Sequence, residues 1–383
     1  MLAMQYQLGQ SQWLHPSQIH AQQFSQLRIL IDHARRTVPF YQSMLNELAV
    51  ADALQLSTEL WQKIPLLSRT ELQKVSTAIH SNAIPRDHGG TATIQTSGST
   101  GMPVTMQTTS LAQFFWRAIT LRDHLWHQRD FSARLAAIRP EGNLQPGRGV
   151  ERQGWGQATD DIFACGPSAV LSVRTPVDEQ AVWLRQQNPV YFLSLPSNIA
   201  ALAGHFLENG WQLPGLLEVR TYGELLDDSV RELCRQAWQV PVTDMYSAQE
   251  VGYIALQCPE AGNYHVQAEN LLVEIVDEQG NPCLANEIGR VVLTPLHNFA
   301  MPLLRYAIGD YAAFGPACPC GRGLPVLEKI AGRQRNMLVL PDGSQHWPSF
   351  PAELWAPFVA IRHSSSFNSG LTPSPFAWLP SRG

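Results

Sequence analysis

Val190-Tyr191-Phe192-Leu193, followed by the helical stretch Asn198 to Leu207, is the part of the sequence that decides the fold class. Similar short apolar runs alternate with helical stretches from Phe131 to Val242. This alternation is typical of strands and helices that build a largely parallel sheet. The sequence therefore predicts an α/β fold.

Upstream of this part, residues 1–90 have a helical pattern. One helix has apolar residues at helical spacing, at Phe24, Leu27, Leu30, Ile31 and Ala34. A second helix is expected from Glu71, after the start signal Leu67-Ser68-Arg69-Thr70. We therefore expect residues 1–90 to form a helical lead-in to the large domain.

Downstream, residues 265–314 contain the runs 270–276 and 290–294, separated by the turn-forming stretch 277–281. Strand-like runs around such a turn predict a hairpin-rich β segment. Residues 363–383 have neither helical nor strand period, so we expect no packed element there. This end is interpreted as a disordered tail, a frameshifted end or a truncated segment.

The composition is that of a globular chain without an excess of basic charge. The chain has 383 residues, 44% hydrophobic and 15% charged, and a formal net charge of −5. This charge gives no reason to expect nucleic acid or a membrane as a partner. No apolar run reaches the roughly 20 residues that span a bilayer, and residues 1–13 lack the order of a secretory leader. We therefore expect a cytoplasmic protein without a disulfide framework.

The most specific local motif is Thr96-Ser97-Gly98-Ser99-Thr100-Gly101-Met102-Pro103-Val104, after the strand-like Thr93-Ile94-Gln95. Glycines allow close backbone approach, so successive N–H groups can converge on an anion, and hydroxyls add donors without bulk. No Gly-Lys-Ser/Thr follows, which disfavours a P-loop kinase or ATPase. Two interpretations remain, a phosphate-binding loop and a Ser/Gly-rich surface turn.

Further motifs give this loop a context. Together they resemble the phenylacetate–CoA ligase-like branch of the adenylate-forming enzymes, and the resemblance covers residues 25–337. It implies a large N-terminal body with mixed sheets, helices and a β-rich subdomain. The motifs occur in the family's order: Thr37-Val38-Pro39-Phe40-Tyr41, Ser97 to Pro103, Tyr222-Gly223-Glu224-Leu225, Asp244-Met245-Tyr246-Ser247-Ala248-Gln249-Glu250, Pro302 to Asp310, and Gly332-Arg333.

The resemblance implies catalytic roles for Thr100 and Glu250. Thr100 is the best hydroxyl contact in a loop that holds the β- and γ-phosphates, and Glu250 binds a Mg²⁺ ion that bridges phosphate oxygens. From the residues alone, the alternative for Glu250 is an acid at a helix N-terminus. The loop residues implied to hold phosphate are Ser97, Gly98, Ser99, Thr100 and Gly101.

The resemblance also implies contacts to the nucleoside. Tyr246 stacks on the adenine, and Gly223-Glu224 forms the opposite wall. Asp310, after the turn-forming Ile308-Gly309, accepts hydrogen bonds from the ribose hydroxyls. Arg333 matches a hinge arginine that contacts the ribose or a phosphate. The alternatives are a core aromatic for Tyr246, a loop cap for Asp310 and a solvated charge for Arg333.

Three cysteines and a histidine have the composition of a structural zinc site. Cys258 and His265 precede the β segment, and Cys318-Pro319-Cys320-Gly321 follows it. Three thiolates and one imidazole make a closed tetrahedral shell, and members of the family often have a similar set. The alternative is a group of buried free cysteines with a hydrogen-bonded core histidine.

The expected division is the lead-in 1–90, an adenylate-forming body 91–332 that includes the β-rich zinc segment 258–322, and a hinge with a C-terminal remnant 333–383. In the family, a mobile C-terminal domain supplies a lysine near the α-phosphate, and here that domain is expected to be truncated or degenerate. The chain is therefore a fragment of an active ligase, a member that uses another cation, or a nucleotide-binding relative that has lost adenylation. Its only lysines are Lys63, Lys74 and Lys329.

The implied function is activation of a carboxylic acid, aromatic by analogy, with ATP and Mg²⁺, and its transfer as an acyl group to CoA or a carrier thiol. The acid pocket is expected near Trp155-Gly156, Tyr191 to Pro196 and Tyr222. The expected partners are these small molecules and a second copy of the chain. The alternatives are a synthetase that adenylates a deazaflavin hydroxyl and a non-catalytic nucleotide-binding protein.

Overall fold

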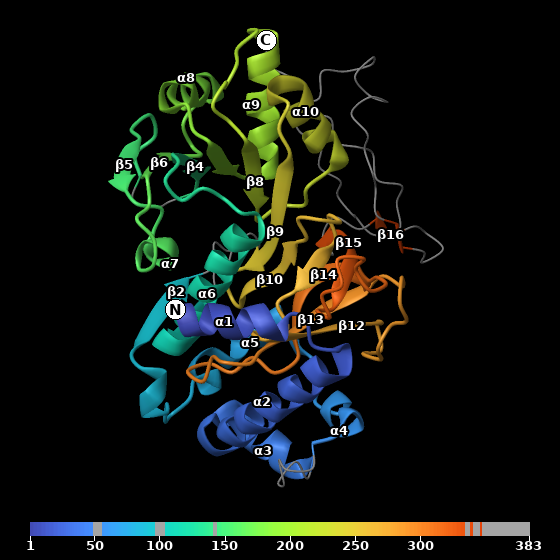
Figure 1. The fold of residues 1–383 in the computed structure, drawn as a ribbon. Coiled ribbons are helices and arrows are strands. Elements are labelled where there is room, and N and C mark those ends of the chain that lie inside the picture. The colour runs from blue at the N-terminus through green and yellow to red at the C-terminus, as the bar shows by residue number, and fades with distance from the viewer. Residues whose placement is uncertain (49–55, 96–103, 141–143, 334–337, 340–344, 347–383) are drawn as a thin grey trace.

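The computed structural model describes residues 1–383 with the exception of 49–55, 96–103, 141–143, 334–337, 340–344 and 347–383 (Figure 1). The helices between residues 177 and 238 lie with the parallel strands at one end, and the helices between residues 16 and 62 lie at the opposite end (Figure 1). The α/β fold is confirmed. In the part of the chain that the structure describes, no helix is long and apolar enough to cross a membrane.

The described part of residues 1–90 is mainly helical, as predicted. The residues with helical spacing are the buried face of α2, where Leu27, Leu30 and Ile31 are fully buried. The signal before Glu71 is a capping box, because Glu71 N donates to Ser68 Oγ (3.1 Å) and Ser68 N donates to Glu71 Oε2 (2.8 Å). The elements are α1 (Leu2–Ser11), α2 (Pro16–Thr37), α3 (Pro39–Glu47), α4 (Thr58–Gln62), β1 (Leu67–Ser68), α5 (Arg69–Val75), η2 (Ser76–Ile79) and η3 (Arg86–His88).

The middle of the chain forms the predicted parallel sheet. Its strands run in the order β6-β4-β7-β8-β9, every neighbouring pair is parallel, and β5 is an antiparallel edge. The strands are β4 (Leu135–Arg139), β5 (Val150–Gln153), β6 (Pro167–Ser172), β7 (Tyr191–Ser194), β8 (Glu218–Tyr222) and β9 (Val242–Ala248). The helices are α6 (Ser110–Trp126), α7 (Gln157–Asp160), α8 (Val177–Gln187), α9 (Pro196–Glu208) and α10 (Asp228–Trp238).

The faces of this sheet are covered by different helices. Ile138, Phe192 and Val219 point to the face on which α8, α9 and α10 pack, and all are fully buried. On the other face, Met245 of β9 packs against Ile119 of α6. Because side chains alternate along a strand, Arg220, Leu193 and Met245 share this second face.

The remainder is the predicted hairpin-rich segment, which extends the sheet as β9-β10-β11-β15-β14-β13-β12. Residues Leu271 and Val276 of β12 pair with Pro295 and Arg290 of β13, so the predicted hairpin is confirmed. The strands are β10 (Gly252–Gln257), β11 (Tyr264–Val266), β12 (Leu271–Val276), β13 (Gly289–Pro295), β14 (Tyr306–Phe314), β15 (Val326–Arg333), and the separate pair β16 (Leu338–Val339) and β17 (Gln345–His346).

The prediction of a turn at Ile308-Gly309 is wrong. These residues lie inside β14, where Gly309 has a φ of +89° and the pairing with β13 shifts register between Arg290 and Val292. A glycine with positive φ therefore makes a bulge in a continuous strand, because only a residue without Cβ adopts this conformation without strain.

Some expectations fall outside the described residues. The phosphate-loop residues 97–101 do so, although the flanking strands β2 (Thr91–Gln95) and β3 (Thr105–Thr109) form an antiparallel hairpin with Gln95 opposite Thr105. Most of the expected C-terminal remnant and all of its tail from residue 347 are also outside them.

Candidate functional site

Three of the motif residues, from strands β9, β14 and β15, lie together. Tyr246 of β9 donates its hydroxyl proton to Asp310 Oδ2 of β14 (2.8 Å), and Arg333 Nε of β15 lies 3.4 Å from Asp310 Oδ1. Asp310 and Arg333 are direct partners in the β14–β15 pairing. Burial, followed by the negative charge of Asp310, raises the pKa of Tyr246, so its hydroxyl stays protonated and acts as a donor.

Glu250 lies in the turn between β9 and β10, not at a helix N-terminus. Its Oε1 pairs with Arg69 Nη1 at 2.8 Å, and the Glu250 side chain is 6% exposed. Tyr306 lies near this pair, because Leu67 of β1, two residues before Arg69, is opposite Tyr306 of β14. Burial and then the charge of Glu250 raise the pKa of Tyr306. The Glu250 pair and the Tyr246–Asp310–Arg333 cluster therefore belong to one region.

Gly223 and Glu224 follow the end of β8, where Gly223 has a φ of +77°. Glu224 Oε2 accepts a hydrogen bond from the backbone N–H of Ser197 (2.9 Å), in the first turn of α9. A carboxylate at this position stabilises the helix N-terminus. The Glu224 side chain thus ties the end of β8 to α9.

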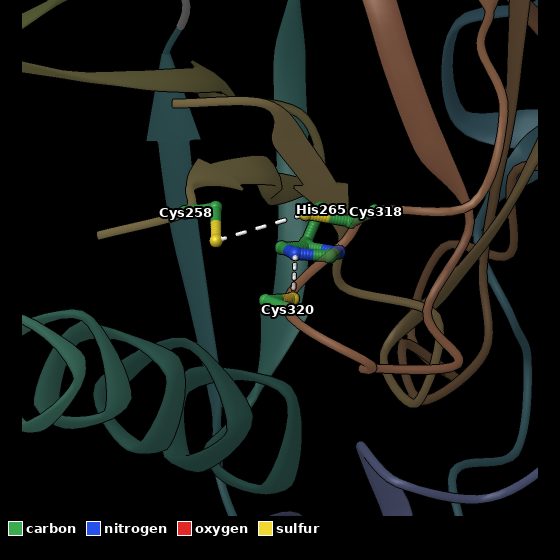
Figure 2. Close-up of side chains that lie close together, drawn as sticks. All are labelled: Cys258, His265, Cys318 and Cys320. Atoms are coloured by element: carbon green, nitrogen blue, oxygen red, sulfur yellow. Dashed lines mark hydrogen bonds between the residues drawn. The ribbon is translucent and has the colours of Figure 1, made fainter. Parts of the chain in front are cut away.

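Cys258, His265, Cys318 and Cys320 lie side by side (Figure 2). Cys318 Sγ is 3.8 Å from Cys258 Sγ, Cys320 Sγ is 3.3 Å from His265 Nε2, and all the ligand atoms lie within 4.8 Å of one another. With Zn–S bonds of about 2.3 Å, two sulfurs of a tetrahedral shell lie roughly 3.8 Å apart. The donor set and its spacing therefore fit Zn²⁺.

The charges around this cluster also fit a metal. Burial, and then the positive charge of Arg322, lower the pKa of His265 to about 4, so the imidazole is neutral as ligation requires. Burial by itself raises the pKa of Cys320, but hydrogen bonds to Arg322 outweigh it and lower this pKa. Arg322 lies over the rings of Trp13 (4.9 Å) and Trp126 (4.7 Å), which hold it beside the sulfurs.

A cavity of about 380 Å³ lies between the parallel sheet and α6. Trp155, Gly156 and Leu193 line it, so two segments expected to form the acid pocket meet there. Tyr222 is not among its lining residues and packs instead against the cluster of Ile119 and Met245.

No family model matches the chain, but individual relatives do. It is 26% identical to the phenylacetate-coenzyme A ligase of Thermus thermophilus over 356 residues, which cover 90% of this chain and 76% of the relative. It is 23% identical to the ligase of the same name from Escherichia coli, over 91% of this chain and 78% of the relative. The chain is a relative of the phenylacetate–CoA ligases.

Solved structures support the same fold. A 2-hydroxyisobutyryl-CoA ligase in complex with 2-HIB-AMP superimposes with a TM-score of 0.67 at 20% identity, over 85% of this chain and 70% of that one. A second state of that ligase, with 2-HIB-AMP and CoA, covers 90% of this chain at the same TM-score. The fold is therefore that of adenylate-forming ligases.

Sequence reasoning missed three arginines that the structure brings to these sites. Arg69 belongs to a helix start signal, Arg322 follows the Cys-Pro-Cys-Gly motif, and Arg220 lies in the short strand β8, so none of them stands out as a site residue. Each meets its partner across more than 60 residues of chain. An arginine without a local motif gives no signal of such a contact, so only the fold reveals it.

Proposed function

We propose that this relative of the phenylacetate–CoA ligases activates a carboxylic acid with ATP as an acyl-adenylate and passes the acyl group to CoA or another thiol. The observation that carries the proposal is the convergence of Tyr246, Asp310 and Arg333 beside the Glu250–Arg69 pair, in a chain with the fold of adenylate-forming ligases. The similar Thermus thermophilus and Escherichia coli proteins, both named phenylacetate-coenzyme A ligase, support it.

Each residue of the candidate site is assigned to a different part of ATP. Asp310 has the acceptor oxygens that ribose hydroxyls need, the Tyr246 ring is available to the adenine, and Arg333 offers donors to the ribose or a phosphate. Glu250 is the carboxylate for Mg²⁺, which neutralises polyphosphate charge when bound. Arg69 is a cation at the same place. The polyphosphate itself is assigned to Ser97, Gly98, Ser99, Thr100 and Gly101.

The Cys258, His265, Cys318 and Cys320 set is proposed to hold a structural Zn²⁺ ion. Four protein ligands complete a tetrahedral shell and leave no open position for a substrate. The metal is therefore assigned no part in adenylation. It joins the end of β10, β11 and the connection from β14 to β15.

The proposed organisation keeps the lead-in 1–90, the body 91–332 and the hinge with a C-terminal remnant 333–383. The proposed location is the cytoplasm, where ATP and CoA are available. Neither nucleic acid nor a membrane is a proposed partner. A homodimer is proposed for the assembly.

The test is release of pyrophosphate from ATP and Mg²⁺ with a panel of aryl and aliphatic acids. We expect release that depends on the acid, and Glu250→Ala should lower kcat/KM by at least about a hundredfold, because a metal-binding carboxylate at a phosphoryl centre supplies several kcal/mol. Glu232→Ala on the exposed face of α10 is the matched control and should retain full activity. ATP binding without acid-dependent release from any acid would instead favour a non-catalytic nucleotide-binding protein.

A further inference from the structure

The cavity between the parallel sheet and α6 has an apolar wall and a basic floor. Leu135, Ala137 and Val170 of β4 and β6 line it together with Leu193 and Met245. Arg220 of β8 lies among these apolar side chains and is only 3% exposed. A charged side chain in such a place needs either a partner or a ligand.

Arg220 has a partner for only part of its guanidinium group. Its Nη2 donates to Asp123 Oδ2 of α6 (2.7 Å), and the Met245 sulfur is 3.5 Å from the same nitrogen. Its Nε is buried and has no hydrogen-bond partner among the described residues. A buried donor without an acceptor is destabilising, so this Nε is available to donate to an acceptor atom of a ligand in the cavity.

The surroundings fix the position of Arg220. Asp123 also pairs with Arg129 (2.6 Å), which in turn pairs with Glu218 (2.7 Å). These ion pairs hold the Arg220 side chain in one position. His124 lines the cavity, and burial followed by the charges of Arg220 and Arg129 lowers its pKa well below the usual value, so His124 is neutral.

The other charges that line the cavity are also mostly positive. Arg139 of β4 and Arg152 of β5 also line the cavity. The lining carboxylate is Asp160, whose oxygens accept hydrogen bonds from the backbone N–H groups of Trp155 and Gly156 (2.9 Å each). The cavity is therefore suited to a ligand with an aromatic or aliphatic body and an acidic end.

The position of Arg220 relative to the nucleotide region gives the length of this ligand. Arg220 precedes Tyr222 by two residues on the same face of β8, a rise of ~7 Å, and Gly223 follows directly. Ligands of open α/β sheets bind at the carboxyl ends of the strands, which is where Gly223 lies. A carboxyl group that reacts there leaves room for roughly one ring before Arg220.

We propose that the acid substrate carries a second acidic group, which binds Arg220 at the inner end of the cavity. The substrate class is a compact dicarboxylic acid, such as an aryl diacid with its carboxyl groups on opposite sides of the ring. One carboxylate is activated at the strand ends, and the other accepts hydrogen bonds from the Arg220 guanidinium, including Nε. This inference rests on the proposed acid-activating function of the same site.

The test compares phenylacetate with 4-carboxyphenylacetate, which differ only by the para carboxylate. In pyrophosphate release, the diacid should have a kcat/KM at least about tenfold higher than the monoacid, since one charge-assisted hydrogen bond exceeds a tenfold effect. Arg220→Met should abolish this preference, so that kcat/KM for the diacid falls to the value for phenylacetate in the same variant. Arg235→Met on the exposed side of α10 is the control and should leave the preference unchanged.

A preference of the wild-type protein for phenylacetate overturns the proposal, as does an equal loss of both activities in Arg220→Met. If that variant does not fold, Arg220→Lys, which keeps the charge and removes Nε, should reduce the preference. Calorimetric titration with each acid separates the two claims. Tighter binding of the diacid without pyrophosphate release refutes acid activation but supports the Arg220 site, and equal or absent binding of the diacid refutes the site.

Discussion

The candidate ATP-binding residues contact one another directly. Asp310 accepts a hydrogen bond from the Tyr246 hydroxyl and lies next to Arg333, so each candidate nucleotide contact also has a structural role. The residue types and their order were predictable from the sequence, but these pairings were not. They depend on the order of the strands in the sheet, because Tyr246 of β9 and Asp310 of β14 are 64 residues apart in the chain.

Because Tyr246 and Asp310 are proposed to contact different parts of ATP, substitutions at the two positions should affect KM for ATP differently. Tyr246→Phe keeps the ring available for the adenine and loses only the hydrogen bond, so KM for ATP should change by less than about threefold. Asp310→Ala removes the acceptors proposed for the ribose and should raise KM for ATP by at least about tenfold. ATP kinetics at a saturating acid concentration measure both, and an equal effect of the two changes would refute the ribose assignment.

The elements that surround the site are held together by packing that no sequence pattern predicts. His297 follows β13, stacks on Phe115 of α6 (ring centroids 3.7 Å apart), and its Nε2 lies 2.9 Å from the Glu269 carbonyl oxygen. Burial lowers the pKa of His297 to about 4. The ring that joins α6 to the β segment is therefore neutral in the folded protein.

Acidification should weaken this contact between elements. An unfolded histidine takes up a proton near pH 6.5, while folded His297 does so only near pH 4. Between these values the unfolded state binds more protons, so stability falls as the pH falls. The loss at pH 5 relative to pH 8 is about 2 kcal/mol from this residue. Urea unfolding of the wild type and of His297→Phe, which keeps the stacked ring, should show a shallower pH dependence in the variant; equal slopes would contradict it.

The elements themselves were largely predictable, for physical reasons that differ from one to another. The apolar run before Pro196 and the amphipathic spacing of α2 specify their elements locally, and the Ser68–Glu71 capping box fixes a helix start. The bulge at Gly309 was not predictable, because a glycine that follows a β-branched residue is equally compatible with a turn. The sheet-wide order of strands was beyond sequence patterns, since pairing between distant strands is decided by the packed core.

At the scale of the whole molecule, the two halves of the sheet meet where β9 pairs with β10, and β10 with β11. Cys258 follows β10, His265 lies in β11, and Cys318 and Cys320 lie after β14. The residues of this cluster were found from the sequence because cysteine is rare in the chain. The proximity of these four residues in space was not predictable, because the β segment lies between His265 and Cys318 in the chain.

A metal at this place should stabilise the whole fold. The bound ion closes the long loop between Cys258 and Cys320 and satisfies buried thiolates, so its removal should destabilise the β segment and the adjoining strands. We expect protein purified without chelator to contain about one zinc per chain, and a strong chelator to lower Tm by more than about 5 °C. Cys258→Ser should give the same low Tm, which the chelator no longer changes, whereas Cys234→Ser, in the buried face of α10, should still respond to chelator. Metal-free protein with an unchanged Tm would refute the zinc site.

The chelated protein should also bind ATP more weakly, because Tyr246 pairs with Ala255, only three residues before the first ligand, Cys258.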